Sequence, residues 1–180
     1  MSHAAKPFEP LSIAVLTVSD TRDASNDTSG ALLVERALAA GHKLSEQRIE
    51  KDDIFQIRYQ VSKWIASRDT QVVIITGGTG FTGRDSTPEA VSVLLEKQVD
   101  GFGELFRQLS YQDIGTSTVQ SRALAGLANG TLVVCLPGST GACRTGWDGI
   151  LASQLDASHK PCNFVMHLKQ TDSDLCETRA

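Results

Sequence analysis

The chain has 180 residues, of which 41% are hydrophobic and 21% charged, and its formal net charge is −4. These values suit a single domain with one sizeable core. The negative charge argues against nucleic acid as the main partner, because duplex-binding proteins carry a basic face. No apolar run approaches the length of a membrane span, and prolines at positions 7 and 10 interrupt the N-terminus before a signal-peptide core could form. We therefore expect a cytoplasmic protein with reduced cysteines and with neither a nucleic-acid nor a membrane partner.

The first part of the chain alternates strand and helix patterns after a loose N-terminal arm, residues 1–10. A nearly continuous apolar run predicts a strand over 11–18. Thr28 or Ser29 is expected to cap a helix that ends before Gly41. The next strand, over 44–50, is more polar, which indicates a position near an edge of the sheet. Apolar residues at helical spacing then predict a helix over 54–65.

The segment 72–90 is the most informative stretch of the sequence. Its β-branched start, residues 72–76, predicts a strand that is buried on both faces. Glycines and hydroxyl residues follow, and glycine allows backbone N–H groups to approach an anion closely. Ser86 or Thr87 is the expected N-cap of a helix with Pro88 in its first turn. A strand, a glycine loop and a helix start in this order commonly hold a phosphate group.

Asp85 lies at the end of this loop. A carboxylate beside a polyphosphate is unfavourable unless a cation lies between them, so Asp85 is a candidate Mg²⁺ ligand. Residues 78–83 also match the dinucleotide pattern G-x-G-x-x-G, but Pro88 delays the helix and the motif follows the third strand, which argues against a nicotinamide site. The phosphate-binding Walker A pattern lacks its Lys and its Ser or Thr, because Arg84 and Asp85 stand there.

The second half of the chain is less regular. The segment 100–104 interrupts the preceding helix, which is expected to run from Pro88 to Val99, and the Ser/Thr-rich segment 113–121 fits a loop or a short helix. The other expected elements are a helix starting near Leu105, a tight turn at Asn129-Gly130, a core strand over 131–136 and a helix over 142–155. His159, Cys162 and His167 match no standard zinc spacing, so a packed C-terminal segment is the better interpretation.

This alternation predicts an α/β fold with a mainly parallel sheet. Ligands bind outside the carboxyl ends of the strands in such sheets. The residues that follow the predicted strands are therefore the candidate site, and they are Ser19, Asp20, Asp52, the segment 76–85 and the segment 137–140. The two glycine loops among them are similar, and a pair of anion-sized loops suits a ligand with more than one phosphate, although glycine and threonine are also usual turn residues.

Several segments resemble the MoaB/MogA family of molybdenum cofactor biosynthesis proteins, and within it the MoaB branch. The matching segments are 16–21, 76–90, 101–104, 136–139 and 161–164. The segment 76–90 is the most specific of them. The resemblance spans residues 11–169 and implies one molybdopterin-binding domain with a three-layer αβα fold, followed by a polar tail at 170–180. It also implies a homo-oligomer, either a trimer or a hexamer.

The resemblance implies a reaction as well. Active relatives adenylylate molybdopterin with ATP and Mg²⁺ and release pyrophosphate. The family's two catalytic carboxylates match Asp52 and Asp85, which would position Mg²⁺ and the reacting phosphates. A non-catalytic protein that binds or carries molybdopterin is the alternative. A structural scaffold, the role of the related gephyrin domain, is less favoured because a scaffold needs no paired carboxylates.

Further site residues are expectations from this resemblance and from the loop positions. Arg122 fits a surface ion pair as well as a ligand, Asp20 is expected to turn the chain by bonding its own backbone, and Asp53 is expected at the start of a helix. The expected substrate- and nucleotide-binding residues are Ser19, Thr21, Thr76, Gly77, Gly78, Thr79, Gly80, Ser121, Arg122, Pro137, Gly138 and Ser139.

Overall fold

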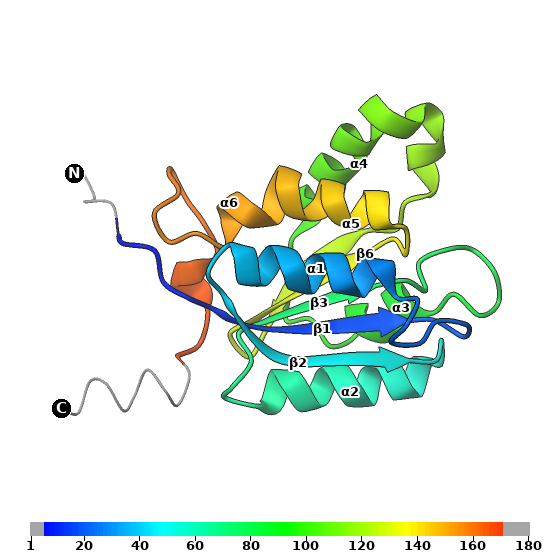
Figure 1. The fold of residues 1–180 in the computed structure, drawn as a ribbon, viewed down its shortest axis with the longest axis horizontal. Helices are drawn as coiled ribbons and strands as arrows, with labels where there is room; N and C mark the ends of the chain where they lie inside the picture. Colours follow the sequence, from blue (N-terminus) through cyan, green and yellow to red (C-terminus); the bar gives the residue numbers. More distant parts are fainter. Residues whose placement is uncertain (1–5, 171–180) are drawn as a thin grey trace.

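A six-stranded sheet covered by helices on both faces forms the centre of the molecule (Figure 1). The computed structural model describes residues 6–170. Half of the predicted N-terminal arm, residues 1–5, and the predicted polar tail from residue 171 onward lie outside the described residues. The strand order is β2-β1-β3-β6-β5-β4.

The elements follow one another in the order that the sequence patterns predict for an α/β protein. They are β1 (Ser12–Val18), α1 (Thr28–Ala39), β2 (Lys43–Glu50), α2 (Ile54–Ala66), β3 (Val72–Thr76), α3 (Thr87–Ser92), β4 (Lys97–Gln98), α4 (Asp100–Ile114), a 3₁₀ helix (Gly115–Gln120), β5 (Leu124–Ala128), β6 (Thr131–Leu136), α5 (Thr140–Gly146), a π-helical turn (Trp147–Leu151), α6 (Ala152–Gln154) and a last 3₁₀ helix (Val165–His167).

The sheet is mainly parallel, as predicted. Strands β2, β1, β3 and β6 run parallel to one another, and β5 and β4 extend the sheet through antiparallel pairs. The polar strand β2 lies at an edge, which confirms its expected position. Because Thr17 pairs with Thr76 and Thr76 with Leu136, the parallel strands end at one level and deliver their following loops to one place.

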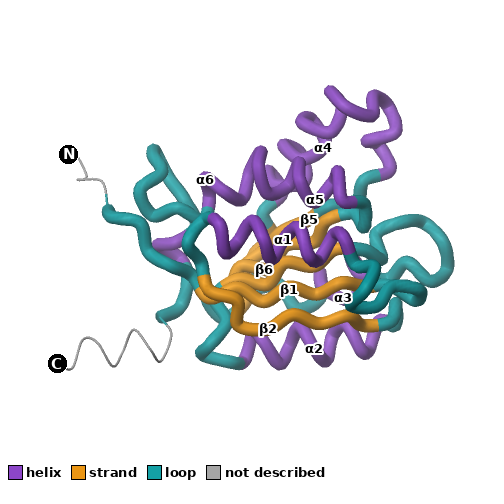
Figure 2. Tube along the Cα trace, viewed as in Figure 1, coloured by secondary structure: helices purple, strands orange, loops and turns teal. Residues whose placement is uncertain are grey.

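Two apolar layers enclose the sheet (Figure 2). Helices α1, α4 and α5 bury Leu33, Phe106 and Cys143 against one face. Helices α2 and α3 bury residues such as Trp64 and Val91 against the other. Strands β1, β3 and β6 supply side chains to both layers in alternation, which explains why their sequences are continuously apolar. The three-layer αβα prediction is therefore confirmed.

The region from 88 to 128 differs from the expectation. The helix that begins at α3 ends at Ser92 rather than Val99, and the chain then forms the short edge strand β4. Helix α4 begins at Asp100, where glycines suggested an interruption. Gly103 lies close to the segment that precedes β5. A Cβ at this position would be 2.7 Å from the carbonyl oxygen of Ala123. Packing, not helix propensity, explains this glycine.

One predicted helix cap is corrected, and another is confirmed in its position. Asp27, not Thr28 or Ser29, caps α1, because its carboxylate accepts a hydrogen bond from the backbone N–H of Gly30. Ser86 occupies the N-cap position of α3 without making a capping bond. Asp53 caps α2 through the N–H groups of Phe55 and Gln56, as its expected place at a helix start suggested.

None of the helices within residues 6–170 combines the length and the apolar character that crossing a membrane requires.

Candidate active site

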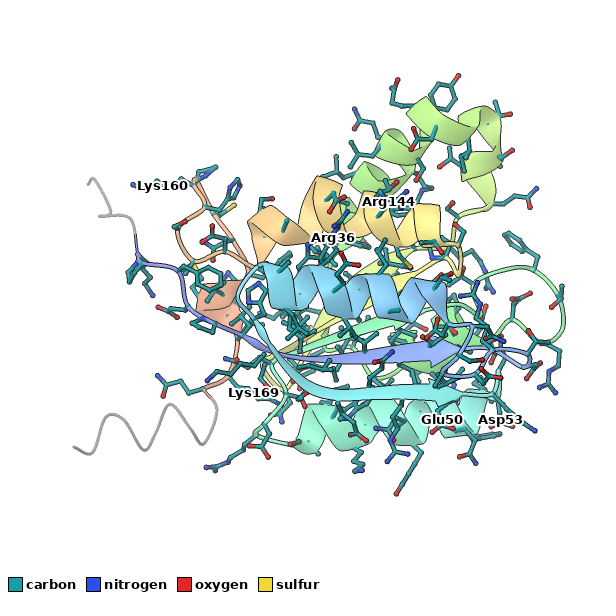
Figure 3. The ribbon with its side chains drawn as sticks, in the orientation of Figure 1. Arg36, Glu50, Asp53, Arg144, Lys160 and Lys169 are labelled. Atoms are coloured by element: carbon teal, nitrogen blue, oxygen red, sulfur yellow. The ribbon has the colours of Figure 1, made fainter. Side chains whose placement is uncertain are left out.

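Three glycine-containing or polar loops meet at the carboxyl ends of β1, β3 and β6. Gly77 has φ +99°, and a Cβ there would lie 2.2 Å from the carbonyl oxygen of Val18. A Cβ on Gly138 would lie 3.2 Å from the Cα of Gly77. Only glycine at position 77 allows both the backbone angle and this approach. Figure 3 labels Glu50 and Asp53 at the same edge, where β2 ends and α2 begins.

Asp52 joins the end of β2 to the start of α3. Its Oδ1 accepts hydrogen bonds from the backbone N–H and from the hydroxyl of Ser86, at 3.0 and 2.7 Å. Its other oxygen, Oδ2, takes neither bond and faces Gly78, where a Cβ would lie 2.7 Å away. The half-buried carboxylate therefore turns one oxygen toward the glycine loop.

Asp85 is held by its own loop. Its Oδ2 accepts hydrogen bonds from the hydroxyl of Thr82 at 2.6 Å and from the backbone N–H of Thr82 at 2.9 Å. The hydroxyl of Thr82 and, to a smaller extent, the N–H groups of Thr82 and Gly80 hold the pKa of Asp85 below its usual value. The carboxylate thus occupies loop amides that the sequence analysis assigned to a bound anion.

Arg122 fixes the shape of the loop from Thr79 to Asp85. Its guanidinium donates hydrogen bonds to the carbonyl oxygen of Thr79 at 3.0 Å, to that of Asp85 at 3.2 Å and to that of Gly80. It also pairs with Glu89. The sequence left Arg122 as either a surface ion pair or a ligand-binding residue. The structure shows the ion pair and, in addition, hydrogen bonds to three backbone carbonyls. Arg122 therefore acts on the loop directly.

The prediction for Asp20 was wrong. Its carboxylate does not bond its own turn; it accepts hydrogen bonds from the guanidinium of Arg84 at 2.7 and 3.1 Å and from the N–H of Asp52 at 3.3 Å. Arg84 holds the pKa of Asp20 below its usual value. The hydroxyl of Ser19 makes the turn instead, by accepting from the N–H groups of Thr21 and Arg22. The Asp20–Arg84 pair links the loops after β1 and β3.

Some of the expected binding residues have structural contacts. Thr76 is fully buried, and its hydroxyl donates to the carbonyl of Pro137. The N–H of Gly77 donates to the carbonyl of Leu136 at 3.1 Å. The hydroxyl of Ser139 caps α5 through the N–H of Ala142. These groups hold the loops together, and in this conformation they are not turned toward a ligand.

A cavity of about 160 Å³ opens beside these loops. Ser121, Pro137 and Ser139 line it, together with Phe106 and Asp113 of α4. Figure 1 shows α4 extending beyond the rest of its layer, and residues of its second half line one side of the cavity. Three of the expected binding residues therefore border one hollow.

Sequence reasoning missed a group of polar side chains at the start of α1. The hydroxyl of Ser29 donates to the carbonyl of Gly138 at 2.8 Å, and the hydroxyls of Thr28 and Thr140 lie 2.9 Å apart. Thr28 and Ser29 were predicted only as helix caps. Their partners after β6 are more than a hundred residues away in the sequence. Only the three-dimensional fold brings these residues together.

Neither buried cysteine has the character of a nucleophile. Burial raises the pKa of the Cys143 thiol to about 11, and the pKa of Cys135 is raised further. Within residues 6–170, no three side chains of His, Cys, Asp or Glu lie close enough together to hold a metal ion. A cation at this edge would therefore need oxygens of phosphates or water in addition to a carboxylate.

Comparison with known proteins identifies the family. A family model described as "Probable molybdopterin binding domain" matches residues 14–157. Molybdenum cofactor biosynthesis protein B of Escherichia coli strain K12 is 55% identical over 170 residues, covering 94% of this chain and 100% of that protein.

Solved structures agree with the sequence comparison. A crystal structure of a molybdenum cofactor biosynthesis protein B matches with a TM-score of 0.79 and 42% identity over 85% of this chain and 94% of its own. The tungsten cofactor synthesizing protein MoaB from Pyrococcus furiosus matches with a TM-score of 0.73 and 35% identity, covering 81% and 92%. The chain therefore belongs to the family of molybdenum cofactor biosynthesis proteins that share this molybdopterin-binding domain.

Proposed function

We propose that the protein is an adenylyltransferase that acts on molybdopterin with ATP and Mg²⁺. An oxygen of the terminal phosphate of molybdopterin forms a bond to the α-phosphorus of ATP. The bond from that phosphorus to the bridging oxygen breaks, and pyrophosphate leaves with the electron pair. The substrate supplies its own nucleophile, so the protein needs only to position the phosphates and to compensate their charge.

Asp52 carries this proposal. Asp52 is a half-buried carboxylate with one oxygen turned toward a glycine loop. A Mg²⁺–phosphate complex requires such a carboxylate, whereas a turn without a ligand does not. When bound, Mg²⁺ would neutralise charge on the phosphate oxygens. Asp85, the second expected Mg²⁺ ligand, accepts the hydrogen bonds of Thr82 on Oδ2. In this proposal the glycine loop takes nucleotide phosphates, and the cavity beside Ser121 takes part of molybdopterin.

The test is an assay with purified protein, molybdopterin, Mg²⁺ and ATP, in which chromatography follows adenylylated molybdopterin. We expect product from the unchanged protein and from Asp69→Asn. Asp69 is a matched control because it precedes β3, at the amino end of the strands and away from the glycine loop. We expect loss of product from Asp52→Asn. Molybdopterin binding without product in any variant would contradict the enzyme and leave a binding or carrier protein.

A further inference from the structure

The cavity beside Ser121 has a single charged residue in its lining, Asp113 of α4. The other residues that line this space of about 160 Å³ are apolar or carry hydroxyl groups. Phe106, Ser110 and Asp113 recur at helical spacing and so share one face of α4. Phe106 and Ser110 are buried. Asp113, which is exposed, therefore continues the inward face of the helix at the mouth of the cavity.

The position of Asp113 in its helix is unfavourable for a carboxylate. It lies in the last turn of α4 (Asp100–Ile114), where the helix dipole and the unbonded carbonyl groups are negative. Within residues 6–170 its carboxylate makes no ion pair or hydrogen bond that would offset this effect. Residues that break a local rule without a compensating contact concentrate at functional sites. The carboxylate is thus a candidate for contact with a ligand.

Two hydroxyl groups in the same cavity also lack partners. Ser110 is only 6% exposed, and its hydroxyl makes no hydrogen bond with any other described residue. The hydroxyl of Ser121 makes none either in the part of the chain that the structure describes. Buried polar groups in folded proteins nearly always have a hydrogen-bond partner, which can be a bound molecule. The polar groups that border this cavity therefore remain available to a ligand.

The charge of Asp113 determines which part of a ligand suits the cavity. A carboxylate repels phosphate groups, whereas an aromatic wall such as Phe106 suits a flat ring. The two oxygens of a carboxylate accept hydrogen bonds best from two adjacent N–H donors. The pyrimidine edge of a pterin presents such a pair, its ring N3–H and its 2-amino group, and guanine presents a similar pair. Adenine does not, because its amino group adjoins a ring nitrogen that only accepts.

We infer that Asp113 recognises the amino-pyrimidinone edge of the pterin ring and is a specificity-determining residue of the site. The inference rests on the proposed function for the identity of the ligand. It adds an orientation to that function, with the ring in the cavity against α4 and the phosphate turned away from Asp113. The hydroxyls of Ser110 and Ser121 are then partners for the remaining polar atoms of the ring.

The experiment measures the binding of two small rings to the purified protein without nucleotide, by ligand-observed NMR titration. 6-Hydroxymethylpterin carries the 2-amino group, and 6-hydroxymethyllumazine has an oxygen in its place. We expect the unchanged protein to bind the pterin at least about tenfold more tightly, because a site built for a donor rejects an analogue that lacks it.

Asp113→Asn should weaken pterin binding at least about tenfold, since hydrogen bonds to a charged group are lost, and should remove most of the preference over the lumazine. Glu104→Gln is the matched control. Glu104 belongs to the same helix but lines a different cavity, so its substitution should change neither affinity.

Thermal unfolding without ligand separates this role from a structural one. Removal of a carboxylate from the last turn of a helix should leave the melting temperature of Asp113→Asn unchanged or raise it. Equal pterin affinity of Asp113→Asn and the unchanged protein would overturn the inference, as would equal affinity of the unchanged protein for the two rings. Guanosine bound as tightly as the pterin would also overturn it. Absence of adenylylated product with the pterin preference intact would contradict only the proposed function.

Discussion

The hydrogen bonding of buried polar groups differs between the two ends of the parallel strands. At the amino end, the N–H of Leu11 donates to His42 Nδ1, Gln71 donates to the carbonyl of Lys169, and the ammonium group of Lys169 donates to the carbonyl of Ile65. At the carboxyl end, Thr87 remains unpaired. A folded chain satisfies its buried polar groups where only stability is at stake. Among the described residues, the unpaired hydroxyl of Thr87 lies beside the glycine loop at which we propose that phosphates bind.

At the carboxyl end a few side chains shape an exposed loop, whereas at the amino end the side chains of His42, Gln71 and Lys169 bond backbone groups of neighbouring segments. Arg122 and Asp85 determine the path of the segment 79–85, and residues 81–84 are exposed. Lys169 closes the amino end, because its carbonyl accepts a hydrogen bond from the side-chain amide of Gln71 and its backbone N–H donates to the carbonyl of Gly130. Single substitutions should consequently change activity at one end and stability at the other.

The largest expected effect is that of Asp52→Asn on adenylylation. The amide oxygen can still accept from Ser86, so the fold should persist, but the charge toward Gly78 is lost. Loss of one preorganised electrostatic group typically lowers a rate by about 10²–10³-fold. The product assay with saturating substrates measures the change. A rate within a factor of two of the unchanged protein would remove Asp52 from the site.

Arg122→Gln should have the next largest effect. The substitution leaves the carbonyls of Thr79 and Asp85 without their charged donor and releases Glu89. Hydrogen bonds to charged groups contribute roughly 1.5–3 kcal/mol, so we expect a loss of about 2 kcal/mol in unfolding free energy. Hydrogen exchange should accelerate in the segment 79–85 and not in the strand β3. Unchanged exchange in the loop would show that Arg122 does not determine its shape.

At the amino end, His42 should make stability depend on pH. Burial lowers its pKa below the ordinary value near 6.5, and its neutral Nδ1 accepts from Leu11. The unfolded chain therefore binds the proton more readily than the folded one. The stability gained by burying neutral His42 is fully present above about pH 6.5. It is lost as the pH falls toward the lowered pKa, by at most about 1.4 kcal/mol per pH unit.

Urea unfolding between pH 7.5 and 5 measures this dependence. His42→Asn offers an acceptor that does not titrate in this range, so its unfolding free energy should decline less over the same interval. The carboxylate of Asp156 near His42 opposes the effect of burial and makes the decline smaller. Parallel curves for the two proteins would contradict the assignment to His42.

The smallest effect is expected for Asp20→Asn. The Asp20–Arg84 pair is exposed, and salt screens such pairs effectively. We expect no measurable change in unfolding free energy and a much smaller change in the adenylylation rate than Asp52→Asn causes. A rate as low as that of Asp52→Asn would place Asp20 among the groups that contact the substrates.

Local sequence patterns predicted the parallel half of the sheet well and the antiparallel half poorly. Strands β1, β3 and β6 are continuous apolar runs because helices cover both faces. Strand β5 reads Leu-Ala-Gly-Leu-Ala, without β-branched residues, and it forms through its pairing with β6. The turn between β5 and β6 was nevertheless predicted, and Asn129 and Gly130 both have positive φ.

The candidate site shows the same division. The residue types after each strand predicted that Asp52 and Asp85 would lie at one edge, since parallel strands end together. Which oxygen of Asp52 bonds Ser86 depends on distances between loops that no local pattern contains. The partner of Asp20 likewise lies in a different loop. Sequence reasoning predicted which residues gather at this end of the strands, and the fold determines which of their atoms are available there.

The most direct test is a crystal structure of the protein with Mn²⁺ and a non-hydrolysable ATP analogue, with anomalous diffraction to locate the metal. We predict one Mn²⁺ at the carboxylate of Asp52, with phosphate oxygens of the analogue completing its shell and with those phosphates at the glycine loop. A metal bound to Asp85 alone, or a nucleotide bound away from the carboxyl ends of the strands, would contradict it.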